Sequence, residues 1–145
     1  MNNLKSSGLK KFAHSIGQNW YHVVLIPKSR YPVFRQDYQR KLMMSAIEWV
    51  CKNHNINLFE SEVMDDHVHL FISCPDNYSI RKLIQIIKGA TSYYVRSKHP
   101  QLRRYKSLWS RGAMYRSVGN VSAEIVEKYI KSSNVWMDSF QRKLI

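Results

Sequence analysis

The sequence has few cysteines, few acidic side chains and no long apolar runs. Only two of its 145 residues are cysteines, Cys51 and Cys74, and no Cys-x-x-Cys pair is present. This argues against a disulfide framework and against a thiolate zinc site, and we interpret both residues as reduced core thiols of a cytosolic protein. No apolar run approaches the ~20 residues that span a bilayer. The polar and basic start lacks the apolar segment of a signal peptide.

Two further absences bear on function. The chain has neither a P-loop nor a Gly-rich dinucleotide motif, which argues against ATP or a hydride-carrying cofactor. Acidic residues number 10 against 23 lysines and arginines, giving a formal net charge of +13. Such a charge favours a polyanionic partner, either nucleic acid or an anionic membrane surface. Because no membrane-directed segment is recognisable, nucleic acid is the better partner.

The hydrophobic pattern predicts one domain of the order β-α-β-β-α-β-α over residues 17–135, between a basic N-terminal arm (1–16) and a short tail (136–145). Strands are expected at 19–27, 56–64, 67–74 and 113–118, and helices at 36–52, 80–98 and 122–133. Ser79 is the expected N-cap of the second helix. We find no internal repeat and no linker. Two strand–helix–strand halves joined by a hairpin predict an α+β, ferredoxin-like or RRM-like antiparallel sheet.

One face of this sheet should pack the first two helices. Val68, Leu70, Ile72 and Cys74 alternate along one strand and therefore share that face. The helical residues expected to face the sheet are Tyr38, Leu42, Ala46, Trp49, Val50, Ile80, Leu83, Ile84, Ile87, Thr91, Tyr94 and Val95. The opposite face, which carries the histidines, is then left for the last helix.

The segment 66–72, Asp-His-Val-His-Leu-Phe-Ile, carries the strongest chemical signal. His67 and His69 lie two residues apart on one strand face, so their imidazoles can converge on one divalent cation. The alternative is two partly exposed histidines on a half-buried strand.

Tyr129 lies in the middle of the apolar stripe of the last predicted helix, which points at the histidine face. Taken alone it is a core aromatic residue. A nucleophile is the less common explanation for a tyrosine at this spacing.

Together these patterns resemble the single-tyrosine HUH transposases, the small transposases of bacterial and archaeal insertion sequences that move as single-stranded DNA. The resemblance runs from residue 17 to residue 133. Its motifs are Tyr21-His22-Val23-Val24, Pro27-Lys28-Ser29-Arg30-Tyr31, Met64-Asp65-Asp66-His67-Val68-His69-Leu70, Ile87-Lys88-Gly89-Ala90-Thr91-Ser92 and Leu108-Trp109.

The resemblance implies that His67 and His69 bind Mg²⁺ or Mn²⁺ and that Tyr129 is the nucleophile, forming a 5′-phosphotyrosine. The family has a glutamine as third metal ligand four residues after the tyrosine, where this chain has Ser133, followed by Asn134. Serine is a poor ligand, and Asn134 reaches the site only if the helix end unwinds. Glu62 and Asp66 are further oxygen donors from the hairpin, although Asp66 is expected on the strand face opposite His67.

We predict a single-stranded DNA partner with hairpin ends, a homodimer and no membrane association, in the cytoplasm and at the nucleoid when acting. The predicted DNA-binding residues are Lys28, Arg30, Lys88, Arg96, Arg103, Arg104 and Arg111. Lys98, Lys106 and Arg116 are additional candidates, with Tyr93, Tyr94, Tyr105 and Trp109 available for base stacking. For any one cation the alternative is a solvated surface residue.

Three rival functions stay open. The first is a non-catalytic RRM-like binding module, which requires exposed aromatic residues on the central strands. The second is a domesticated, repeat-associated tyrosine nuclease. The third is a metal-dependent phosphohydrolase in which water attacks and Tyr129 only packs.

Overall fold

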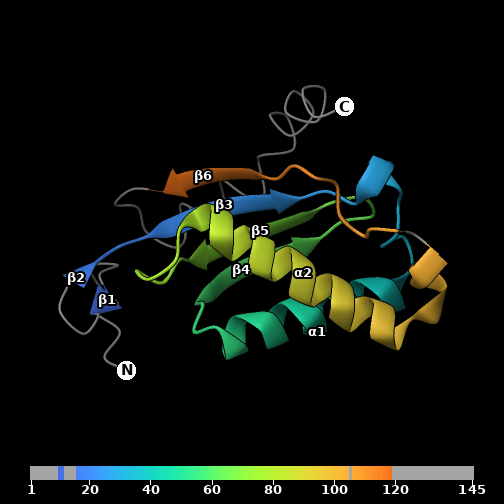
Figure 1. Cartoon of the computed structure of the whole chain (residues 1–145), viewed down its shortest axis with the longest axis horizontal. Coiled ribbons are helices and arrows are strands. Elements are labelled where there is room, and N and C mark those ends of the chain that lie inside the picture. The colour runs from blue at the N-terminus through green and yellow to red at the C-terminus, as the bar shows by residue number, and fades with distance from the viewer. Residues whose placement is uncertain (1–9, 12–15, 105, 119–145) are drawn as a thin grey trace.

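The computed structural model describes residues 10–11, 16–104 and 106–118 (Figure 1). In chain order the elements are β1 (Lys10–Lys11), β2 (Ile16–Gly17), β3 (Trp20–Leu25), the 3-10 helix η1 (Lys28–Arg30), α1 (Asp37–Asn53), β4 (Leu58–Val63), β5 (Val68–Ser73), α2 (Ile80–Lys98), the 3-10 helix η2 (Pro100–Arg104) and β6 (Met114–Val118). The order β3-α1-β4-β5-α2-β6 confirms the prediction as far as the last strand. The predicted helix at 122–133 lies outside the described residues.

Four strands form one antiparallel sheet in the order β4-β5-β3-β6. β4 and β5 are joined by the predicted tight turn, where the amide of Met64 donates to the carbonyl of His67. The two central strands, β5 and β3, are therefore the histidine strand and the strand of the Tyr21-His22 motif. β1 and β2 pair with each other apart from this sheet, within and next to the segment predicted as a basic arm. The division into arm, domain and tail stays a prediction.

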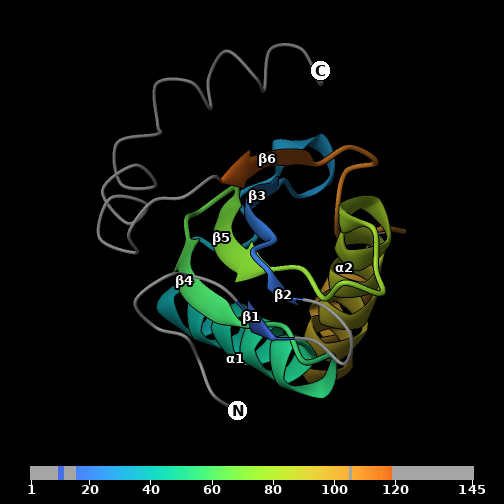
Figure 2. The same ribbon diagram turned by 90° about the vertical axis from the view of Figure 1, so that its left-hand side faces the viewer.

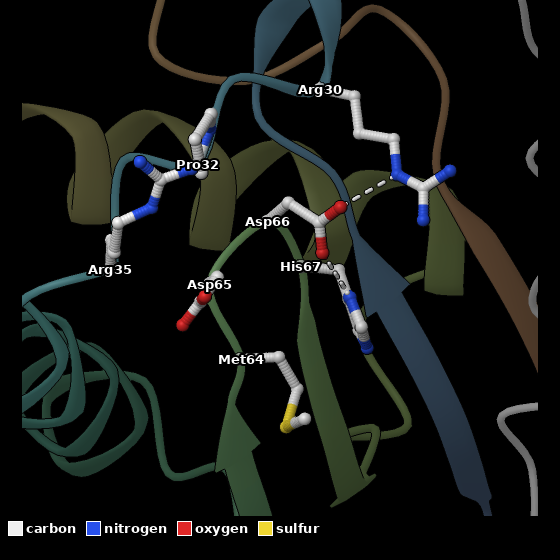
Figure 3. Close-up of a pocket in the computed structure, with 7 residues that line it drawn as sticks. All are labelled: Arg30, Pro32, Arg35, Met64, Asp65, Asp66 and His67. Carbon is white, nitrogen blue, oxygen red and sulfur yellow. Dashed lines mark hydrogen bonds and ion pairs between the residues drawn. The ribbon is translucent and has the colours of Figure 1, made fainter.

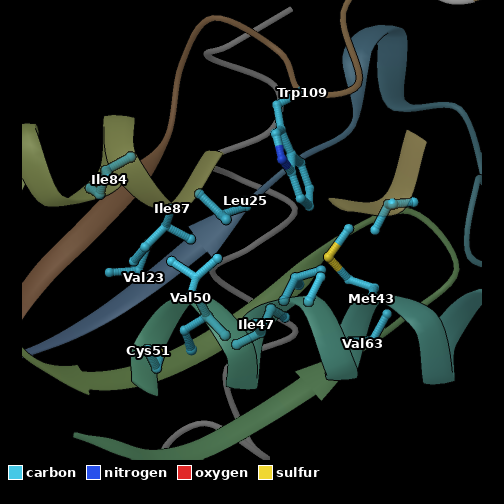
Figure 4. Packing of buried hydrophobic residues seen from close by; sticks show 14 of the residues in the cluster. Val23, Leu25, Met43, Ile47, Val50, Cys51, Val63, Ile84, Ile87 and Trp109 are labelled. Carbon is cyan, nitrogen blue, oxygen red and sulfur yellow. The ribbon is translucent and has the colours of Figure 1, made fainter. Parts of the chain in front are cut away.

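Both long helices lie on the same face of the sheet, as Figures 1 and 2 show. Alternate residues of the central strands, Val23, Leu25, Val68, Leu70 and Ile72, are 0% exposed and pack against both helices. Figure 4 shows part of this core from close by. Which strand face packs the helices was therefore predicted correctly from the alternation of the histidine strand.

The buried face of α1 is rotated from the one we predicted. Ala46 and Val50 are buried as expected, but Tyr38 and Trp49 are 49% and 43% exposed. These two rings lie at the border between α1 and neighbouring elements: Trp49 packs against Tyr94 of α2, and the Tyr38 hydroxyl is 3.2 Å from Nε2 of His99. The stripe that faces the sheet instead includes Met43, Ile47 and Cys51.

α2 has the predicted bounds, and the Ser79 side chain accepts the predicted cap hydrogen bond from the amide of Lys82. Its inward residues are buried, except that Ile80 and Tyr94 are partly exposed. No helix within the described residues is long and apolar enough to cross a membrane.

The segment between η2 and β6 is fixed to the core by Trp109. This side chain is 4% exposed, and its indole N–H donates to the Thr91 hydroxyl on α2 at 3.0 Å. The neighbouring backbone pairs with the end of β3: Lys28 donates to Leu108, and Ser110 donates to Ile26. Trp109 thus helps to hold the start of the basic 28–31 loop.

Candidate functional site

The structure brings His67 and His69 together on the sheet face away from α1 and α2. His67 comes directly before β5, and His69 is its second residue. Their ring centroids are 4.8 Å apart, and their ring planes are nearly perpendicular at 81°. They are 9% and 1% exposed, so the alternative of partly exposed surface histidines does not describe them. The alternation in the sequence correctly predicted their shared face.

Each of these histidines uses Nδ1 for a contact within the protein. His67 Nδ1 is 2.8 Å from Oδ1 of Asp66, and His69 Nδ1 is 3.0 Å from Nε2 of His22. The Nε2 atoms of His67 and His69 are buried and have no hydrogen-bond partner among the described residues. Metal-binding histidines have this arrangement, with one nitrogen held by a protein group and the other directed at the ion. The two residues therefore fit a divalent cation.

Asp66 holds His67 from the turn between β4 and β5. Its Oδ2 accepts a hydrogen bond from Nε of Arg30 at 2.7 Å, while Oδ1 faces His67 (Figure 3). Burial raises the pKa of Asp66, but the hydrogen bonds from His67 and Arg30 outweigh it and hold this pKa below its usual value. The carboxylate is therefore ionised at neutral pH and can only accept, which makes His67 Nδ1 the donor.

Our expectation that Asp66 points to the strand face opposite His67 is wrong. β5 begins only at Val68, so Asp66 belongs to the turn before it and does not follow the strand alternation. The turn lets the carboxylate fold back beside the next imidazole. Arg30 reaches the same carboxylate from a loop in which Ser29 and Arg30 both have positive φ, at 56° and 54°.

His22 is the site residue that we did not single out from the sequence. It lies on β3, is 0% exposed, and its ring stacks on that of His69 with centroids 5.3 Å apart. Burial, with a smaller effect from the charge of Arg116, lowers the pKa of His22 to about 4. Burial, with His67 and His22 nearby, lowers the pKa of His69 to about 3. Both rings are thus neutral at pH 7, as metal coordination by His69 requires.

The described residues supply only part of a coordination shell. Within residues 10–11, 16–104 and 106–118, no three His, Cys, Asp or Glu side chains are grouped closely enough to hold a metal ion. Glu62 pairs with His69 across the β4–β5 ladder but is exposed. Tyr129, Ser133 and Asn134 lie outside the described residues, so the nucleophile and the third ligand stay predictions.

An open pocket of about 510 Å³ lies beside His67 (Figure 3). Its lining combines cationic and acidic side chains with two apolar ones: Arg30, Pro32, Arg35, Met64, Asp65, Asp66 and His67. The two arginines come from the loop before α1, and the acidic residues come from the β4–β5 turn. The pocket thus leads from a cationic loop to the first histidine.

Comparison with known proteins identifies the family. Residues 15–133 match the family model described as "Transposase IS200 like". The chain belongs to the IS200-like transposase family. This confirms the resemblance derived from the motifs.

Individual relatives agree with this assignment. The chain is 29% identical to the transposase for insertion sequence element IS200 of Salmonella typhimurium over 125 residues, which cover 84% of this chain and 81% of that protein. It is 25% identical to the ISDra2 transposase TnpA of Deinococcus radiodurans over 129 residues, which cover 87% of this chain and 91% of that protein.

Two solved structures share the fold of this IS200-like transposase. A crystal structure assigned to a transposase from Deinococcus radiodurans R1 has a TM-score of 0.69 and 22% identity, covering 84% of this chain and 95% of that one. A REP-associated tyrosine transposase bound to a REP hairpin has a TM-score of 0.57 and 11% identity, and the match covers 94% of this chain and 75% of that one. At these identities the similarity supports the α+β fold alone.

The basic residues predicted to bind DNA have different environments in this IS200-like transposase. Lys28 and Arg111 are exposed, whereas Arg30 is paired with Asp66. The Lys88 ammonium donates to the carbonyls of Ser110, Arg111 and Gly112, at 2.6, 3.3 and 3.4 Å. Burial lowers the pKa of Lys88.

Two of the remaining predicted DNA-binding residues lie close together near the end of α2. Nε of Arg103 donates to the backbone carbonyl of Arg96. The Arg104 side chain lies outside the described part of the chain. DNA contact by these residues stays a prediction.

The aromatic residues proposed for base stacking also differ in how exposed they are. Trp109 is buried and bonded to Thr91, so its assignment as a stacking platform is wrong. Tyr94 packs against Trp49, whereas Tyr93 is 74% exposed, so its ring is accessible for stacking on a base. Tyr105 lies outside the described residues.

Phe71 bears on the RRM-like alternative, because that alternative requires exposed aromatic rings on the central strands. Phe71 is on β5 but is only 1% exposed, and its ring packs against Trp20 and Phe59 at 5.6 and 5.0 Å. It therefore offers no open ring face to a base.

Proposed function

We propose that this IS200-like transposase cleaves and rejoins single-stranded DNA at the ends of its insertion sequence through a 5′-phosphotyrosine at Tyr129. The observation that carries the proposal is the pair of buried Nε2 atoms of His67 and His69, each without a partner among the described residues and with its Nδ1 held by the protein. Family membership over residues 15–133 and the net charge of +13 support the same proposal.

His67 and His69 would hold Mg²⁺ or Mn²⁺ through Nε2. When bound, such an ion polarises the scissile phosphate and withdraws charge from its non-bridging oxygens. Asp66, anchored by Arg30, keeps the His67 ring turned toward that position. Arg30 and Arg35 flank the pocket beside His67 and would attract the DNA backbone, since guanidinium groups pair well with phosphate oxygens.

The Tyr129 hydroxyl would lose its proton and attack phosphorus. The bond from phosphorus to the 3′-oxygen breaks, and that oxygen takes up a proton to become a free 3′-hydroxyl. The phosphotyrosine bond retains the energy of the cleaved linkage, so a 3′-hydroxyl from a second strand can reverse the step and release Tyr129. Cleavage and rejoining would thus need no nucleotide cofactor.

The substrate and the assembly belong to the same proposal. We propose that the protein recognises hairpins at the DNA ends, since a relative of the same fold is bound to a REP hairpin. Lys28, Arg96, Arg103, Arg104 and Arg111 would contact the phosphates, whereas the Lys88 ammonium is engaged with backbone carbonyls. We further propose a homodimer, with the third ligand position occupied by water, by the region of Ser133 and Asn134, or by another oxygen donor.

The test is incubation with Mg²⁺ or Mn²⁺ and single-stranded DNA that carries the flanking hairpins, labelled at the 5′ or the 3′ end. Denaturing gels should show a covalent protein–DNA band for the wild type. Tyr129→Phe should abolish this band because the nucleophile is lost, and His67→Ala should abolish it because the metal site is lost. Cleavage without an adduct would instead indicate a hydrolase, and tight binding without cleavage would indicate a binding protein.

A further inference from the structure

His22 and His69 meet through their ring nitrogens on the two central strands. The β3–β5 register pairs His69 with Val24 and Phe71 with His22, which places both imidazoles on one face in diagonal positions. His22 Nε2 and His69 Nδ1 are 3.0 Å apart, and the two ring planes are within 18° of each other. Both rings are almost completely buried, so this contact is not replaced by water.

A hydrogen bond between two imidazole nitrogens contains one proton, which belongs to one of the two rings. If His22 donates, the neutral His69 carries its own proton on Nε2, and that nitrogen has no lone pair for a metal ion. If His69 Nδ1 donates, Nε2 keeps its lone pair. Only the second arrangement matches the use of His69 as a ligand.

His67 does not face this choice, because its partner is an ionised carboxylate that can only accept. His69 has a partner that can either donate or accept, so the direction of its hydrogen bond depends on the tautomer of His22. A neutral imidazole is also a less costly acceptor than a carboxylate at this buried position, because a second buried carboxylate would need charged partners to offset its desolvation.

We propose that His22 is a positioning residue that accepts a hydrogen bond from His69 Nδ1 and thereby holds His69 in the tautomer whose Nε2 binds the metal ion. This inference rests on the proposed metal site of His67 and His69. In this arrangement the Nε2 of His22 is occupied by the hydrogen bond from His69 and does not bind the metal ion.

The first test reads the tautomer directly in the full-length wild-type protein. Long-range ¹H–¹⁵N correlation spectra of ¹⁵N-histidine-labelled, EDTA-treated protein at pH 7.5 distinguish a ring protonated on Nδ1 from one protonated on Nε2. We expect His69 to be protonated on Nδ1. Protonation of His69 on Nε2 would overturn the inference, and this measurement requires no substitution that could impair folding.

The second test uses a matched pair of variants and Mn²⁺ alone, with free Mn²⁺ measured by electron paramagnetic resonance. His22→Gln retains an acceptor near the position of Nε2, whereas His22→Phe keeps a planar ring without an acceptor. His22→Phe should weaken Mn²⁺ binding about 10–100-fold, the usual effect of losing such a partner. His22→Gln should bind within about 3-fold of the wild type. Equal affinity of the two variants would refute the positioning role.

A control separates this inference from the proposed function. His69→Ala should abolish Mn²⁺ binding if the metal site is correctly assigned. If His69→Ala binds as well as the wild type, the metal site itself is wrong and the inference falls with it. If His69→Ala fails to bind but His22→Phe binds normally, only the role of His22 is wrong.

Discussion

Thr91→Val should destabilise the protein through the buried indole of Trp109. The Thr91 side chain is 0% exposed, and its hydroxyl accepts the Trp109 N–H at 3.0 Å while donating to the carbonyl of Ile87 at 2.6 Å. Valine has nearly the same shape but no acceptor, so the indole N–H is left buried without a hydrogen bond. Such a loss costs about 1–3 kcal/mol. For a domain of this size about 2 kcal/mol corresponds to a Tm lower by roughly 6–8 °C.

Thr91→Ser is the matched control, because it keeps the hydroxyl and loses one buried methyl group, worth about 0.8 kcal/mol. Urea unfolding followed by far-UV circular dichroism should therefore rank the wild type above Thr91→Ser and Thr91→Ser above Thr91→Val. In a Trp109→Phe background, where no N–H needs an acceptor, Thr91→Val should cost at least about 1 kcal/mol less. If Thr91→Val is as stable as Thr91→Ser, the hydrogen bond does not hold the segment before β6.

The remaining predictions concern acid and salt. Below the ordinary histidine pKa of 6.5, the unfolded chain binds protons that folded His22 and His69, with pKa values of about 4 and 3, do not. The free energy of unfolding of the EDTA-treated protein should therefore fall as pH is lowered from 6.5 toward 4, by about 1.4 kcal/mol per unit for each histidine. Urea unfolding at a series of pH values should show that the free energy of unfolding of His22→Phe changes with pH about half as steeply as that of the wild type. An unchanged pH dependence would contradict the lowered pKa of His22. Lys88→Met should lower stability by about 1–2 kcal/mol, because the ammonium bonds three carbonyls. It should leave the salt dependence of DNA binding unchanged, whereas a slope smaller by about 0.7 would instead show a phosphate contact.

Local sequence patterns were sufficient for the elements and for the histidine pair. A strand repeats every two residues and a helix every 3.6, so the bounds of α2, its Ser79 cap and the buried face of β5 follow from residues close together in the chain. The shared face of His67 and His69 follows in the same way. The motifs also identified the family correctly, because they combine residue types with spacing along most of the chain.

Contacts between elements could not be obtained from these periodicities. The exposure of Tyr38 and Trp49 depends on where α2 and His99 meet α1, and the burial of Trp109 depends on Thr91, 18 residues earlier in the chain. A helical stripe limits which face is buried only to within about one residue position. Whether the residues at the border of the stripe are buried then depends on the neighbouring element.

The sequence alone determined the order of the strands and helices up to β6, the basic charge, the family and the shared strand face of His67 and His69. Each of these is a property of composition or of local spacing. Only the tertiary structure decided how those histidines are held. Asp66 reaches His67 because the turn departs from strand alternation, and His22 reaches His69 across 47 residues because β3 pairs with β5 in one particular register. Register is set by the burial of a whole strand face, and a shift by one residue would place His22 on the opposite face of the sheet.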